Sequence, residues 1–89
     1  MNQEQIKSKL INIISDQLGL YNSFLSSKTT LNDLGADYLE QAEILLEIEK
    51  EFGFDFKNYV EMGGESFENL CLYVENALKK KENLQENSI

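Results

Sequence analysis

Apolar residues recur every three or four positions in three stretches of this chain, which is the spacing of one face of an α-helix. The first stretch runs from Glu4 to Leu18, and Gly19 is a suitable residue to end a helix there. The last stretch follows Ser66, whose hydroxyl can cap the first turn of a helix. The residues of this last helix that we expect to face inward are Phe67, Leu70, Cys71, Val74 and Leu78.

The middle stretch carries a clear signal for the start of a helix. Asp37 is a common N-cap residue, and Glu40 three residues later can complete a capping box with it. The apolar pattern then continues to about Phe52, where Gly53 can end it. The pattern therefore predicts a second helix that follows Asp37.

The segments between these stretches predict the rest of the fold. Residues 20–36 are rich in Ser, Thr and Asn and show no clean period, so they predict a long loop. Five apolar residues should hold this loop against the bundle: Leu20, Phe24, Leu25, Leu31 and Leu34. Tyr59, Val60 and Met62 allow one short helical turn. We predict an all-α, small four-helix bundle in residues 1–80, with a long first loop and a short third helix, and a polar, frayed tail at 81–89.

The length, charge and composition of the chain narrow the range of functions that it can have. The chain has 89 residues and a formal net charge of −8, so we expect one domain that avoids nucleic acid and membrane surfaces and binds basic proteins. It has no histidine and one cysteine, Cys71, so we expect neither an enzyme nor a metal site, and we interpret Cys71 as a buried structural thiol. The single cysteine cannot form an internal disulfide and the N-terminus lacks an apolar signal core, so we expect a protein of the cytoplasm. We also expect a monomer.

The second helix has two distinct faces when each residue advances it by about 100°. The inward set is Gln41, Ile44, Leu45, Ile48 and Phe52. The outward set is Leu39, Ala42, Glu43, Leu46 and Lys50, with Glu47 beside them. One interpretation is a surface helix with stray leucines, which are common on protein surfaces. The other is a docking face with an apolar centre and an acidic rim, suited to a basic partner helix.

The run Leu34-Gly35-Ala36-Asp37-Tyr38-Leu39 resembles the "LGADSL" signature of acyl carrier proteins. The following "EILLEIEKEFGFDF" is also similar to that family, and the resemblance covers residues 3–80. It implies the same four-helix bundle. In the family, the serine of the signature carries 4′-phosphopantetheine, whose thiol holds an acyl group. Tyr38 stands at that position.

The resemblance therefore implies docking without loading. A tyrosine oxygen lies several ångströms beyond a serine oxygen, and a misplacement of ~1 Å can already cost ~100-fold in rate. We expect Tyr38 to stay unmodified and the chain to carry no cofactor. The residues that the resemblance assigns to partner binding are Asp37, Leu39, Glu40, Glu43, Leu46 and Glu47. The expected partners are basic surfaces of acyl-processing or carrier-loading enzymes of fatty acid, polyketide or related pathways.

Two further questions stay open at this point. "MGGESFENL" resembles the "LGGxSL" signature of peptidyl carrier domains, which would make Ser66 the attachment residue, but only 23 residues follow it and Gly-Gly-x-Ser is also an ordinary helix cap. The chain as a whole is an unloaded docking protein, a working carrier whose attachment position was substituted or engineered, or an unrelated small helical interaction module.

Overall fold

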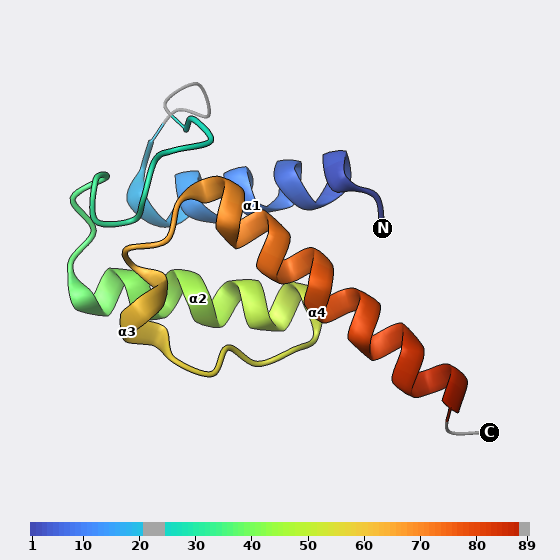
Figure 1. Cartoon of the computed structure of the whole chain (residues 1–89). Coiled ribbons are helices and arrows are strands. Elements are labelled where there is room, and N and C mark those ends of the chain that lie inside the picture. Colours follow the sequence, from blue (N-terminus) through green and yellow to red (C-terminus); the bar gives the residue numbers. More distant parts are fainter. Residues whose placement is uncertain (21–24, 88–89) are drawn as a thin grey trace.

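The structure is a computed structural model that describes the backbone of residues 1–20 and 25–87, with side chains up to residue 82. Four helices follow one another in this part of the chain (Figure 1): α1 (Gln3–Leu18), α2 (Tyr38–Phe52), α3 (Tyr59–Met62) and α4 (Phe67–Asn87). This arrangement confirms the predicted all-α bundle with a long first loop and a short third helix.

The caps that the sequence predicts form as expected. Gly19 ends α1 and Gly53 ends α2, both with the positive φ (67° and 73°) that glycine tolerates best. Asp37 is the N-cap of α2, and Glu40 completes a reciprocal capping box with it. The start of α1 has a box that the sequence did not suggest to us, in which Asn2 pairs with Gln5.

The core lies where α1 packs against both α2 and α4. Its most deeply buried side chains are Ile6, Leu10 and Ile14 from α1, Leu31 from the first loop, Ile44, Leu45 and Ile48 from α2, and Leu70 and Val74 from α4. Each helix turns the stripe that its apolar spacing predicts toward the core, although Cys71 and Leu78 of α4 are only half-buried. Gln41 is only half-buried, and its amide is hydrogen-bonded at the edge of the core.

The first loop is tied to the start of α4. The carbonyl of Thr29 accepts a hydrogen bond from the amide of Phe67 (2.6 Å), and the carbonyl of Ser27 accepts one from the amide of Glu68 (2.9 Å). Both amides belong to the first turn of a helix, where they have no partner within the helix. Of the apolar loop residues, Leu31 is buried, Leu20, Leu25 and Leu34 are half-buried, and Phe24 lies outside the described residues.

The end of the chain differs from the prediction. Residues 81–87, predicted as a frayed tail, continue α4 to Asn87, and Figure 1 shows this part of the helix extending beyond α1 and α2. The segment holds Lys, Glu, Asn, Leu and Gln and no Gly or Pro, so it contains no strong helix breaker. Among the described residues, no helix combines the length and the apolar character that a membrane span requires.

Candidate functional site

Tyr38 is the first residue of α2, and its side chain is 68% exposed. Its position is fixed by the capping box before it: an Asp37 carboxylate oxygen accepts from the Glu40 amide (2.8 Å), and the Asp37 amide donates to the Glu40 carboxylate (3.0 Å). Gly35 turns the chain into this cap with a φ of 77°, a conformation that a residue with a Cβ rarely adopts. The result is a rigid helix start that presents the phenol to solvent.

A polar cluster supports this helix start from the side of the bundle. The Gln41 amide donates to the Asn32 side-chain oxygen (2.7 Å) and to the Ala36 carbonyl (2.9 Å). The Asn32 backbone amide in turn donates to the Gly63 carbonyl (3.1 Å). The cluster therefore joins the first loop and the start of α2, which are close in sequence, to the end of α3, which is distant from both. In the sequence, this cluster was indicated by Gln41, a polar residue on the otherwise apolar inward face of the helix.

The outward face of α2 holds the residues to which the resemblance assigns docking. Leu39 and Leu46 are 66% and 43% exposed, and the carboxylates of Glu43 and Glu47 lie beside them in solvent. Glu43 accepts a hydrogen bond from Gln17 of α1 (2.5 Å), and Glu47 pairs with Lys50 at 3.6 Å. Asp37 and Glu40 lie at the N-terminal end of α2, where each uses its carboxylate in the capping box. Five of the six residues lie on α2, and Asp37 is its N-cap.

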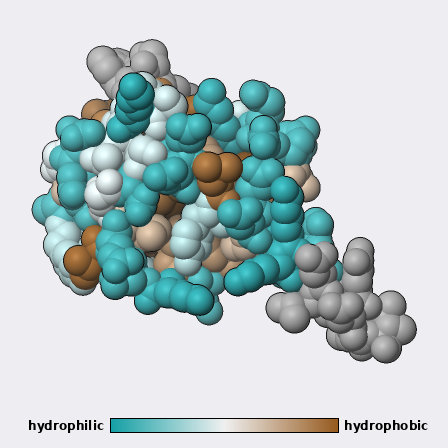
Figure 2. All heavy atoms as spheres, in the orientation of Figure 1, coloured by the Kyte–Doolittle hydropathy of each residue, from teal (hydrophilic) through white to brown (hydrophobic). Residues whose placement is uncertain are grey.

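Val60 is a further exposed apolar residue that was not among our site residues. It lies on α3, which packs against α2, and it is 66% exposed. Figure 2 shows an apolar patch at one edge of the molecule. In Figure 1, the start of α2 and α3 lie at this edge. The spacing did carry a signal: Tyr59 and Met62, three residues apart, turn inward and leave Val60 on the opposite side.

A single carboxylate sets the position of α3 relative to α2. Glu49 accepts a hydrogen bond from the Phe56 backbone amide (2.8 Å) and another from the Tyr59 hydroxyl. The bond to Glu49, together with burial and the negative charges of Glu49 and Asp55, raises the pKa of Tyr59 to about 12. The loop between α2 and α3 is therefore held to Glu49 at its middle, through Phe56, and at its far end, through Tyr59.

Ser66 has the role of a helix cap. Its hydroxyl oxygen accepts from the Asn69 amide (3.2 Å), and Ser66 pairs across an isolated bridge with Thr30 of the first loop. Cys71 is half-buried rather than fully buried, and its burial raises the pKa of the thiol. Within the described residues, no group of three carboxylate, thiol or imidazole side chains is placed to hold a metal ion.

Comparison with known proteins decides the family. Residues 1–89 match a sequence model described as the C-terminal acyl carrier protein domain of the highly reducing polyketide synthase sdgA. The chain belongs to the acyl carrier protein family. An acyl carrier protein of Cyanidioschyzon merolae is 30% identical over 90 residues, which cover 100% of this chain and 96% of that protein.

Shorter matches agree with this assignment. An acyl carrier protein of Guillardia theta is 39% identical over 56 residues, or 62% of this chain and 69% of the relative. One of Thermotoga maritima is 40% identical over 53 residues, or 58% of this chain and 65% of the relative. Acyl carrier proteins are carriers rather than catalysts, and the family cofactor is 4′-phosphopantetheine.

Proposed function

We propose that this acyl carrier protein docks to biosynthetic enzymes but is not loaded with 4′-phosphopantetheine, because Tyr38 takes the place of the attachment serine. The observation that carries the proposal is an exposed phenol at the first position of α2, directly after the capping box. The family signature puts the loaded hydroxyl at this position.

The phenol does not suit the loading reaction for a geometric reason. A transferase must bring the attacking oxygen in line with the phosphate of coenzyme A, and an error of ~1 Å can cost ~100-fold. The serine oxygen is one bond from Cβ, whereas the tyrosine oxygen lies across a whole ring. The capping box fixes the backbone of Tyr38, so the backbone cannot retreat to compensate without breaking the cap. The residue present therefore does not fit the family cofactor.

The docking role has separate support. Leu39, Leu46 and Val60 offer an exposed apolar centre, while Glu43 and Glu47 provide negative charge around it. Such a surface suits a basic partner, since electrostatic attraction speeds encounter and apolar contacts slow dissociation. The net charge of −8 also opposes self-association and so favours a monomer.

The favoured setting is polyketide synthesis. The family model that spans the whole chain is described as belonging to a highly reducing polyketide synthase. The three relatives described above are named only as acyl carrier proteins, and these names specify no pathway. Fatty acid synthesis is therefore the alternative pathway. A working carrier whose attachment residue was replaced is the alternative function, and it is favoured by the intact cap and outward face around Tyr38.

Intact-protein mass spectrometry tests the proposal. The chain is incubated with coenzyme A and a broad-specificity phosphopantetheinyl transferase, beside the variants Tyr38→Ser and Tyr38→Ala. We expect Tyr38→Ser to gain the mass of one arm, and the unaltered chain and Tyr38→Ala to gain none. An arm on the unaltered chain would overturn the proposal, and Ser66→Ala in the same assay would show whether Ser66 carries it.

A further inference from the structure

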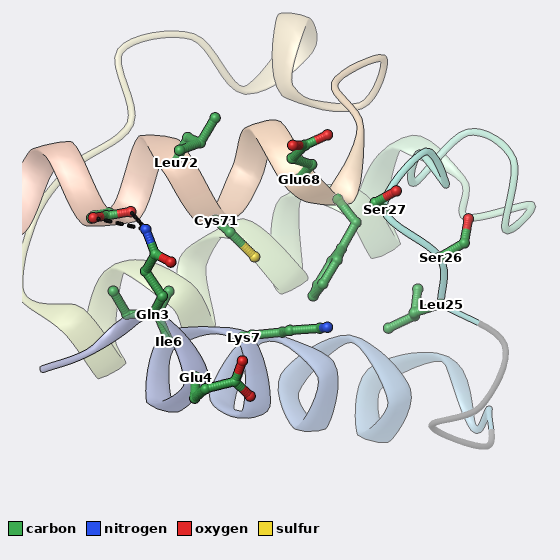
Figure 3. A pocket seen from close by; sticks show the side chains of 12 residues that line it. Gln3, Glu4, Ile6, Lys7, Leu25, Ser26, Ser27, Glu68, Cys71 and Leu72 are labelled. Atoms are coloured by element: carbon green, nitrogen blue, oxygen red, sulfur yellow. Dashed lines mark hydrogen bonds between the residues drawn. The ribbon is translucent and has the colours of Figure 1, made fainter.

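A groove opens between α1 and α4, on side chains that the docking face of α2 does not use (Figure 3). We call it the α1–α4 groove. Its volume is about 490 Å³, and all of its lining residues belong to α1, the first loop at 25–27, or α4. The buried side chains of Ile6 and Phe67 form its floor, together with half-buried Cys71. Leu25 and Leu72 stand at its sides, and Leu72 is 46% exposed.

The rim of the α1–α4 groove is acidic. Glu4, Glu68 and Glu75 line it, against a single cation, Lys7. Glu75 is engaged twice, since it accepts from the Gln3 amide at 3.2 Å and 3.4 Å and pairs with Lys79 at 3.4 Å. Figure 3 shows the Gln3–Glu75 contact bridging the two helices, while Cys71 points its sulfur into the space between them. The contact closes one end, so an occupant has to enter from the open side.

We propose that the α1–α4 groove is a second docking site, and that its occupant is a basic amphipathic helix of a partner protein. The apolar floor and the half-exposed Leu72 fit one or two large apolar side chains spaced along such a helix, as in other helix-in-groove contacts. Glu4 and Glu68 lie on opposite walls, where they face lysine or arginine residues that flank the apolar anchors.

The negative charge around the α1–α4 groove favours a basic helix over two other possible occupants, a second copy of this chain and an anionic ligand. A second copy of the chain would bring another charge of −8 to an already acidic rim. An anionic ligand would meet three carboxylates and one ammonium group. A basic helix is attracted both by the negative net charge of the chain and by the carboxylates that line the groove. The inference goes beyond the proposed function, because the α1–α4 groove shares no lining residue with the outward face of α2.

Cys71 makes the proposal testable, since it is the single thiol of the chain and lines the α1–α4 groove. The probe is a synthetic helix of about five turns with leucines on one face and lysines beside them. Its control carries glutamate at each lysine position. The rate of Cys71 alkylation by iodoacetamide is measured with and without each peptide. At about ten times its Kd, a bound peptide should slow alkylation roughly tenfold. The acidic control should have no effect.

Matched variants locate the binding site. Leu72→Ala and the pair Glu4→Gln/Glu68→Gln should each weaken protection of Cys71 by about threefold or more. Their controls on α2 are Leu46→Ala, which removes a leucine of similar exposure (43%), and Glu43→Gln/Glu47→Gln, which removes the same charge. Each control should leave protection unchanged, and circular dichroism confirms that every variant is folded.

Three results would overturn the proposal. The first is unchanged alkylation at saturating basic peptide, and the second is equal loss of protection in the α2 controls. The third is protection that grows with protein concentration alone, because the occupant would then be a second copy. None of these results bears on whether Tyr38 is loaded, so the two proposals fail separately.

Discussion

Replacing Glu49 with Gln should destabilise the bundle although it removes only one negative charge from an acidic protein. The Glu49 carboxylate accepts from the Phe56 amide (2.8 Å) and from the Tyr59 hydroxyl. A glutamine can keep its oxygen on the Phe56 amide and donate its NH2 group to the Tyr59 oxygen, but both hydrogen bonds then lose their charged acceptor. Exchanging two hydrogen bonds to a charged group for two neutral ones costs about 2 kcal/mol. For a domain of this size, that corresponds to a fall in Tm of roughly 10 °C or more.

Glu47→Gln is the matched control, because it makes the same charge change on the same helix. Glu47 is exposed and, among the residues whose side chains are described, pairs only with exposed Lys50 at 3.6 Å, so its loss should change stability by less than about 0.5 kcal/mol. Thermal and urea unfolding followed by circular dichroism measure both variants. Equal destabilisation by the two changes would refute the role assigned to Glu49.

The ionisation of Tyr59 provides a second readout. Its pKa is raised to about 12, first by the hydrogen bond to Glu49. In Glu49→Gln it should fall toward the usual value of about 10. Absorbance of tyrosinate followed against pH measures this, and Tyr59→Phe identifies which transition belongs to Tyr59. Because the folded pKa lies above the unfolded one, this contribution to stability is complete below about pH 10 and is lost as the pH rises toward 12.

Three other predictions concern the core, the polar cluster and the charge. Ile48→Ala should cost ~2–5 kcal/mol in urea unfolding because Ile48 is fully buried, whereas Leu46→Ala should cost less than about 1 kcal/mol; equal costs would mean that α2 is rotated. Gly63→Ala should cost about 1–3 kcal/mol, because its Cβ would collide with the side-chain oxygen of Gln41 and displace the Gln41 NH2 group from its hydrogen bonds; Gly64→Ala, with its nearest neighbour at 3.9 Å, is the control that should be nearly neutral. Tm should rise with added NaCl, which screens the charge of −8 over about 10 Å at 0.1 M; a flat or falling Tm would contradict this.

Much of the fold could be predicted because its signals are local. Asp37, Glu40 and Gly53 mark the ends of α2 within a few residues, and the apolar spacing of α2 identifies the buried face. The extent of α4 was underestimated because the polar composition after residue 80 was taken as a sign that the helix ends there, while fraying of this end stays a prediction. Composition alone does not stop a helix that tertiary packing has already started.

The features that escaped prediction depend on contacts between distant segments. The hydrogen bonds from Phe67 and Glu68 to the first loop join residues about 40 positions apart, and the Gln3–Glu75 contact spans 72. No periodic pattern marks such pairs. The α1–α4 groove exists only because two helices far apart in sequence meet at its floor, so a scan along the chain could not find it.

The central claim is that the chain docks without being loaded, and competition tests both halves at once. The Tyr38→Ser variant is loaded by a phosphopantetheinyl transferase while increasing amounts of the unaltered protein are added, and the mass of each species is followed over time. The account predicts that the unaltered protein slows loading of the variant competitively and gains no mass. Loading that proceeds at full rate in the presence of excess unaltered protein, or an arm found on Tyr38 itself, would contradict it.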